Sequence, residues 1–303
     1  MSLNKNDRLK KIAASSSISL AVTLCIIKGM AVVYTGSLAV FSSMIDSLAD
    51  ILASLITYYA VKVSGRPASC KYRYGYGKAE ALSALAQAMF IAMSGIFVLL
   101  DGLERLVESK VLQQTALGLA AMGVSLFLTF VLVAFQRYVA RKTNSQAILA
   151  DSMHYSVDIL TNLAIIFSLF IIHFWKINQV DAIMAIVVAI YLLYCAYGLA
   201  KGAATLLLDK ELSDDIRADV LRIIRSHKLH PEVHDLRTHD LGGMYMFEFH
   251  LELDGSLSLR EAHQYTAEIE DMLRQAYPNA QVIAHQEPLG IEDERLDNRL
   301  GVC

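Results

Sequence analysis

Two pairs of polar residues, each spaced by four positions, lie inside long apolar stretches of the sequence. Asp46 and Asp50 stand in AVFSSMIDSLADILASLITYYAV, and His154 and Asp158 stand in DSMHYSVDILTNLAIIFSLFIIHFW. Positions i and i+4 of a helix share a face, so each pair predicts two metal-ligating groups aimed in one direction. A carboxylate at the centre of a bilayer costs about 2.5–3.5 kcal/mol, so packing alone does not explain three of them. Three carboxylates and one imidazole form a suitable tetrahedral set for zinc or a similar divalent ion.

The composition predicts a membrane domain followed by a small soluble domain. The 303 residues are 55% hydrophobic and 19% charged, whereas soluble proteins average about 45–50% and about 25%. We expect a six-helix transport domain over 1–208, a soluble domain over 209–291 and a disordered tail over 292–303. The net charge of -3 gives no indication of a nucleic-acid partner. The four cysteines form no CxxC pair, so neither a disulfide framework nor a cysteine-based zinc site is expected.

Six stretches are long and apolar enough to span a bilayer as helices. They lie near 12–34, 39–63, 80–103, 115–137, 146–174 and 178–206. Lysine and arginine concentrate in the N-terminal segment and in the loops after the second and fourth spans. The positive-inside rule therefore predicts a multi-pass protein with both termini in the cytoplasm. Lys28, inside the first span, is interpreted as a side chain that reaches towards an interface.

The polar region after the spans predicts a small α/β module. Residues 213–228 and 257–277 have helical periodicity, and 232–240, 244–254 and 280–288 read as strands. Gly242 and Gly243 suit a hairpin turn between the first two strands. In the second strand Phe247 and its alternate neighbours face one side, while His250 and Glu252 face the other. The element order, helix, strand, strand, helix, strand, predicts one sheet with helices on one face.

Histidines are concentrated in this module, which holds seven of the nine in the chain. His250 lies on the polar face of its strand, and His285 and Glu287 point the same way from the last strand. Imidazole with carboxylate suits zinc, so we expect a second metal cluster here, with ordinary sheet-surface polarity as the alternative. His227, His230 and His239 are interpreted as surface residues.

Several segments resemble a known family. They are DSLAD (46–50), YGYGKAE (74–80), DSMHYSVD (151–158), LLLDKEL (206–212), HDLRT (234–238), FEFHLELD (247–254) and VIAHQEP (282–288). Together they resemble the cation diffusion facilitators, in particular the bacterial YiiP/FieF subgroup of zinc and ferrous-iron efflux proteins. The resemblance covers nearly the whole chain.

The resemblance implies a homodimer in the bacterial inner membrane that exports Zn²⁺ in exchange for protons. It implies a cytoplasmic, metallochaperone-like domain that binds metal and dimerises. The sites that it implies are a transport site, a cytoplasmic binuclear site, an inter-domain interlock and an apolar gate. Their residues are, in that order, Asp46, Asp50, His154 and Asp158; His234, His250, His263, His285 and Glu287; Lys78 and Asp209; and Met153.

Two departures from the family pattern carry expectations of their own. Relatives have a further metal site in the loop between the second and third spans, where this chain has Ser69, Tyr72 and Tyr76. Serine and tyrosine are poor zinc ligands at neutral pH, so we expect that site to be absent. Glu287 replaces the usual aspartate, and its longer arm could change affinity or spacing in the cluster.

The expected mechanism couples metal transport to proton transport, because ligands must lose protons to bind metal. His154 is the expected coupling residue, because the unperturbed pKa of histidine, about 6.5, lies near physiological pH. Metal bound in the soluble module would bias the dimer through the interlock. The donor set favours Zn²⁺, would accept Cd²⁺, and binds Fe²⁺ more weakly.

Two other classes of function remain open. A membrane-bound metal sensor would keep the soluble cluster without transport, although the four-ligand set in the spans argues against it. A membrane metalloenzyme would need a general base beside its metal. Asp151 lies one turn before His154 and could serve, but it is interpreted as a carboxylate on a solvent-facing helix surface.

Overall fold

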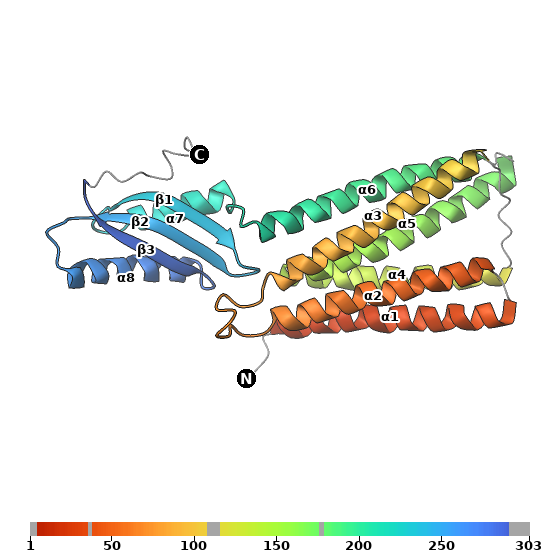
Figure 1. Ribbon diagram of the computed structural model, residues 1–303, viewed down its shortest axis with the longest axis horizontal. Helices are drawn as coiled ribbons and strands as arrows, with labels where there is room; N and C mark the ends of the chain where they lie inside the picture. The colour runs from red at the N-terminus through yellow and green to blue at the C-terminus, as the bar shows by residue number, and fades with distance from the viewer. Residues whose placement is uncertain (1–4, 36–37, 108–115, 176–178, 291–303) are drawn as a thin grey trace. The chain divides into compact units, whose positions relative to one another are not determined.

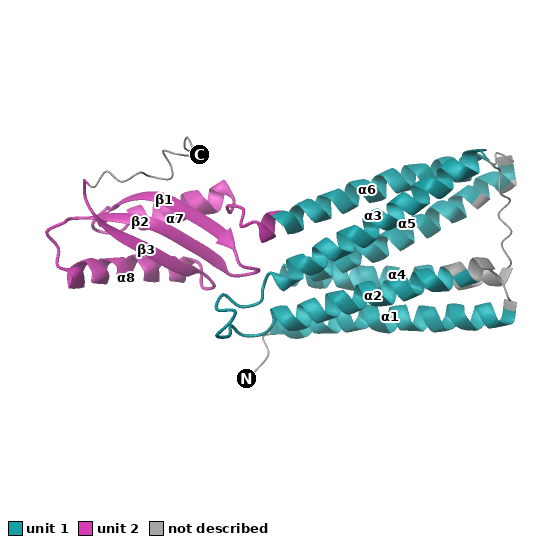
Figure 2. Cartoon of the chain, in the orientation of Figure 1, with its two compact units in different colours: residues 1–204 teal, residues 205–303 magenta. Residues whose placement is uncertain are grey.

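The computed structural model describes residues 5–35, 38–107, 116–175 and 179–290. The chain divides into two compact units, residues 1–204 and 205–303 (Figure 2). Each unit has its own hydrophobic cores. The tail expected at 292–303 lies outside the described residues.

The N-terminal unit is a bundle of long helices (Figure 1). The described residues contain six helices that are long and apolar enough to cross a membrane, as the hydropathy predicted. They are α1 (Lys5–Thr35), α2 (Leu38–Ser64), α3 (Ala79–Val107), α4 (Ala116–Thr143), α5 (Gln146–Trp175) and α6 (Gln179–Leu207). The expectation of six spans is therefore confirmed.

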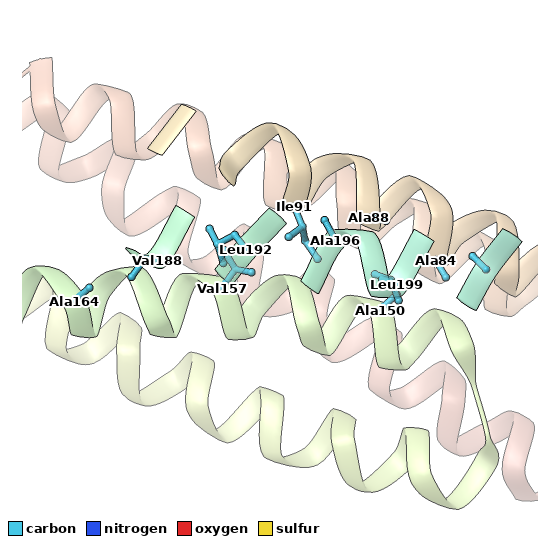
Figure 3. Close-up of a cluster of buried hydrophobic side chains, with 11 residues drawn as sticks. Ala84, Ala88, Ile91, Ala150, Val157, Ala164, Val188, Leu192, Ala196 and Leu199 are labelled. Atoms are coloured by element: carbon cyan, nitrogen blue, oxygen red, sulfur yellow. The ribbon is translucent and has the colours of Figure 1, made fainter. Parts of the chain in front are cut away.

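Small side chains bring α3, α5 and α6 close together. Figure 3 shows Ala84 and Ala88 of α3, Ala150 and Ala164 of α5 and Ala196 of α6 in one buried cluster. Small residues let helix backbones approach where lipid offers no hydrophobic driving force for association.

Gly102 extends this close packing along α3. A Cβ atom at Gly102 would lie 3.1 Å from Ile186 Cγ1 and 3.2 Å from Ala185 Cβ. At those distances any larger side chain would force α3 and α6 apart.

The C-terminal unit contains the expected small α/β module. Its elements are α7 (Asp214–Arg225), β1 (Glu232–Asp240), β2 (Tyr245–Leu253), α8 (Leu259–Ala276) and β3 (Gln281–Pro288). The sheet order is β1-β2-β3; β1 pairs antiparallel with β2, and β2 pairs parallel with β3. The order α, β, β, α, β predicted from periodicity is confirmed.

One face of this sheet is covered by α7 and α8 (Figure 1). Alternate residues of β2, Phe247, Phe249 and Leu251, pack with Val220 of α7 and Ile269 of α8 in a single buried cluster. The intervening residues of β2 therefore point to the other face, which leaves them available for chemistry.

Two polar devices fix the connections in this unit. Gly242 and Gly243 have φ of 92° and 99°, and Asp240 Oδ1 accepts hydrogen bonds from both backbone nitrogens, which makes the expected hairpin turn. Ser258 and Glu261 form a capping box at the start of α8.

His227 is not a surface residue, so that expectation is wrong. Its side chain is 4% exposed, and its Nε2 lies 3.1 Å from Glu268 Oε2, which joins the end of α7 to α8. Hydrogen bonds from Lys228 and His227 hold the pKa of Glu268 at about 2, well below its usual range. Sequence spacing gave no sign of this contact, because its partners are 41 residues apart.

Candidate metal centres

Three of the four ligands expected in the spans meet between α2 and α5. Asp50, His154 and Asp158 each offer a ligand atom, and these atoms all lie within 4.8 Å of one another. His154 Nε2 lies 3.2 Å from Asp50 Oδ1. Ligand atoms around tetrahedral zinc are about 3.3 Å apart when the bonds are about 2.0–2.1 Å. The spacing of this group therefore suits one small divalent ion.

The His154 ring is held from both sides. Its side chain is 8% exposed, and the rings of Phe90 and Tyr155 meet it edge-on at centroid distances of 6.4 Å and 5.7 Å. Among the described residues, its buried Nδ1 has no hydrogen-bond partner. Packing therefore fixes the ring while Nε2 faces the carboxylates.

Asp46 lies outside this close group and is exposed. Beside it, Lys28 Nζ donates to Ser47 Oγ at 2.8 Å and to the Ser43 carbonyl at 3.1 Å. The expectation that Lys28 reaches towards an interface is therefore wrong, because its ammonium bonds to α2 inside the bundle.

Asp151 does not face solvent, so that interpretation is also wrong. Its carboxylate is completely buried. It accepts hydrogen bonds at 2.5 Å from both Ser17 Oγ of α1 and Gln136 Nε2 of α4. On α5, Asp151 precedes Tyr155 and Asp158 by one and two turns on one helix face, but that pattern does not distinguish a buried acid from one that faces solvent.

The second cluster lies on the sheet face opposite the helices. His234, His250 and Glu287 come from β1, β2 and β3, and their ligand atoms all lie within 4.8 Å of one another. His250 Nδ1 is 2.6 Å from Glu287 Oε1, and His234 Nε2 is 3.3 Å from Glu287 Oε2. The central glutamate thus offers one oxygen to each histidine.

Strand register explains why these residues meet. His234 pairs with His250, and His250 pairs with His285, so the three histidines form one row across the sheet. Two residues further along, Glu252 pairs with Glu287 on the same face. A β-bulge follows His234, where Asp235 has a φ of 53°, and restores the alternation of β1 after the row.

His285 lies at the edge of this cluster, and His263 lies outside it. His285 Nε2 lies 3.5 Å from Glu287 Oε1, but its side chain is 67% exposed. His263 is exposed on α8 and does not belong to the close group.

Glu252 was not among the expected site residues. It is buried, and its Oε1 lies 3.1 Å from His234 Nδ1. A carboxylate on the second ring nitrogen is the usual way in which a metal-binding histidine is oriented. Strand alternation placed Glu252 on the correct face, and its identity as an acid was the available signal.

The donor set of this cluster fits a resident zinc ion. Imidazole nitrogen and carboxylate oxygen are zinc ligands, and the buried His234 Nδ1 has no properly angled hydrogen bond among the described residues.

In the loop between α2 and α3, the residues at the substituted positions contact one another. Ser69 Oγ lies 3.1 Å from the Tyr76 hydroxyl, and the Tyr72 and Tyr76 rings lie 4.8 Å apart. Among the described residues, the two clusters above are the places where histidine, cysteine, aspartate or glutamate groups could share an ion, and neither is in this loop.

The remaining expected residues have defined places in their own units. Met153 lines a cavity of about 280 Å³ between α4, α5 and α6, together with Val157 and Leu192. Lys78 directly precedes α3, and Asp209 follows α6 with a φ of 53°. The gate and the interlock stay predictions.

Comparison with known proteins gives matches along nearly the whole chain. The family model described as "Cation efflux transmembrane domain" matches residues 15–208, and "Cation efflux protein, cytoplasmic domain" matches residues 212–289. The cation-efflux pump FieF of Serratia proteamaculans is 38% identical over 96% of this chain and 97% of that protein. FieF of Yersinia enterocolitica is 39% identical over 94% of each. The solved metal-bound C-terminal domain of the CzcD transporter from Thermotoga maritima is 23% identical over 27% of this chain and 100% of that one, with a TM-score of 0.25.

Proposed function

The chain belongs to the cation efflux family, the cation diffusion facilitators, and from that premise we propose that it exports Zn²⁺ in exchange for protons. Membership in this family makes it a multi-pass membrane protein that moves divalent cations, rather than a catalytic enzyme. Zinc as the cargo, proton antiport and assembly as a homodimer are the parts that we propose.

The single observation that supports the cargo is the group of Asp50, His154 and Asp158 between two membrane-spanning helices. Two carboxylates with one imidazole match the ligand types and spacing of zinc. Asp46, one turn from Asp50, supplies the fourth ligand when its side chain turns inward. With four ligands from two helices, the site holds an ion only while α2 and α5 keep their register.

Proton coupling follows from the ligand chemistry. Zinc binds the neutral imidazole and the ionised carboxylates, so loading the site displaces protons from these side chains. Histidine is the side chain that most often exchanges protons near physiological pH, so in this proposal His154 gives up its proton when metal binds. When the site opens to the more acidic side, protons return to these groups and the ion leaves.

In this proposal both termini lie in the cytoplasm of a bacterial cell and the protein lies in the inner membrane. The uneven distribution of lysine and arginine between the loops supports this orientation. The C-terminal unit is then a cytoplasmic module, which fits the description of the family model that it matches. That module joins two protomers.

The C-terminal cluster would hold one or two resident ions. His234, His250 and Glu287 would ligate the first ion, and Glu287 and His285, together with His263 from the first turns of α8, would ligate the second. The bound ions would supply positive charge that draws the three strands and α8 together. Lys78 and Asp209 would carry that change to the membrane unit, which would be a regulatory coupling between the two sites.

The test is zinc-driven proton flux in proteoliposomes. We expect Asp50→Ala and His154→Ala each to abolish the flux, while Ser168→Ala, a buried serine of α5 away from the site, should keep it. Near-normal flux in either ligand variant would refute the transport site. A sensor without transport would bind zinc with no flux in the unmodified protein.

A further inference from the structure

Asp151 is the most deeply buried acid near the transport site, and the ligand set does not use it. Ser17 Oγ and Gln136 Nε2 reach its Oδ2 at 2.5 Å. Gln87 Nε2 of α3 and Thr57 Oγ1 of α2 reach its Oδ1 at 3.3 Å and 3.5 Å. One carboxylate of α5 thus accepts hydrogen bonds from four other helices.

All four partners are neutral donors, and two of them are oriented at a cost. The buried carbonyl oxygens of Gln87 and Gln136 have no hydrogen-bond partner within the described residues. A buried acceptor without a partner is destabilising. Both amides nevertheless turn their NH₂ groups to Asp151, which indicates that the carboxylate determines how this part of the bundle is arranged.

Asp151 is also the first rung of a polar seam between α2 and α5. Thr57 faces Asp151 at 3.5 Å, Ser54 Oγ lies 2.8 Å from the Tyr155 hydroxyl, and Asp50 Oδ1 lies 3.2 Å from His154 Nε2. The first contact joins residue 57 of α2 to residue 151 of α5, and the other two join residues 54 and 50 of α2 to residues 155 and 154 of α5, so the two helices run antiparallel along the seam.

The third rung of this seam is the metal site. From this we propose that Asp151 is a positioning residue for the transport site, a role that rests on the proposed function. It sets the register of α5 against α2, and thereby the distance between Asp50 and the His154–Asp158 edge.

A small change in the register of α5 against α2 is large compared with the distances that a metal site tolerates. A slip by one residue moves a helix by about 1.5 Å along its axis. Ligand atoms in a metal site must lie within about 0.2 Å of their proper distances. Two further rungs of fixed partners keep the seam from slipping, and Ser17 joins them because its hydroxyl donates to Asp151 while its carbonyl accepts from Tyr155 at 3.3 Å.

The residues that hydrogen-bond to Asp151 also connect the site to the rest of the bundle. Gln87 Nε2 donates in addition to the Ala53 carbonyl and to Thr57 Oγ1, each at 3.0 Å, so α3 contacts α2 and α5 at one point. Gln136 Nε2 also lies 2.7 Å from Ser17 Oγ, which links α4 to α1. A substitution at Asp151 therefore alters hydrogen bonds to each of the helices that pack around the α2–α5 seam.

The experiment compares Asp151→Asn with a double variant that exchanges acceptor and donor. The asparagine keeps the volume but places an NH₂ group where one carboxylate oxygen accepts two of the four hydrogen bonds. Adding Gln136→Glu restores one carboxylate and one amide at the α4–α5 contact. Ser168→Ala is the control, because its buried hydroxyl has no partner among the described residues.

Each protein is measured in two ways. Zinc affinity is determined on the purified full chain in a His250→Ala background, which weakens the C-terminal cluster. The KM and maximal rate of zinc-driven proton flux are determined in proteoliposomes. We expect Asp151→Asn to weaken zinc binding and raise KM by about tenfold or more, as when the partner of a metal ligand is lost. The double variant should recover most of the loss, and Ser168→Ala should match the unmodified protein.

Tyr155→Phe covers the case in which Asp151→Asn does not fold. It removes the middle rung and keeps every partner of Asp151, so KM should rise severalfold while the thermal stability stays near that of the control. Unchanged affinity in a folded Asp151→Asn, or in Tyr155→Phe, would overturn the positioning role and leave the transport site intact. Unchanged affinity in Asp50→Ala would overturn the transport site and, with it, this role.

Discussion

Glu252 provides a sensitive test of the cluster in the C-terminal unit. Its Oε1 lies 3.1 Å from His234 Nδ1, while the other nitrogen of that ring faces Glu287 at 3.3 Å. We predict that Glu252→Gln weakens zinc binding by the cluster without removing a ligand. The glutamine keeps the shape but loses the charge that orients the ring and strengthens it as a ligand.

The size of the effect follows from the arrangement. Losing the carboxylate partner of a metal-binding histidine costs about 10–100-fold in affinity, or about 1.4–2.7 kcal/mol. Because Glu252 is 7% exposed, water does not replace it easily, and we expect the upper half of that range.

The assay is a calorimetric zinc titration of the full chain in an Asp50→Ala background, which removes the transport site. Glu248→Gln is the matched control, because Glu248 lies on the same strand and face but pairs in register with Arg237. Affinity within twofold of the background in Glu252→Gln, or an equal loss in both variants, would refute the orienting role.

Three further outcomes test other parts of the structure. Tyr76→Phe should leave the number of zinc ions bound per chain unchanged, because its hydroxyl contacts Ser69 rather than a metal site; a lower number would mean that the loop binds metal. Gly102→Leu should lower the free energy of unfolding by about 1–3 kcal/mol through overpacking against α6 and so lower the melting temperature. Gly198→Leu should not, because nothing lies within 4 Å of its added Cβ. Equal changes in the melting temperature of the two variants would contradict the packing. The pKa of Glu268 is lowered to about 2 from 4.5, so its contribution to stability is complete above pH 4.5 and is lost as the pH falls towards 2. The difference in urea unfolding between the unmodified chain and Glu268→Gln should therefore close over that interval, and a difference that is constant with pH would exclude this ion-pair contribution.

The architecture could be predicted because its signals are local. Long apolar runs gave the spans, and the alternation of Phe247 with His250 gave the faces of β2. The spacing of Asp50, His154 and Asp158 gave candidate ligands, but their meeting required the packing of α2 against α5, for which the family resemblance supplied the only argument. Asp46 shows the limit of spacing, since a shared helix face does not bring two side chains to one point.

Asp151 shows where sequence patterns fail. A lone aspartate near a helix start has the same pattern whether it faces water or four buried donors. Its partners come from four helices and lie up to 134 residues away, so no periodicity links them. The interpretation of His227 as a surface residue was wrong for the same reason, because the contact that buries its side chain is made by a helix distant in the sequence.

The central claim is that the Asp50, His154 and Asp158 site exchanges zinc for protons. The most direct measurement follows zinc movement in proteoliposomes while the imposed pH gradient is reversed. Antiport predicts that zinc moves against the direction of proton flow and that its direction reverses with the gradient, with no movement in His154→Ala. Zinc flux of the same direction and rate under both gradients would contradict the account.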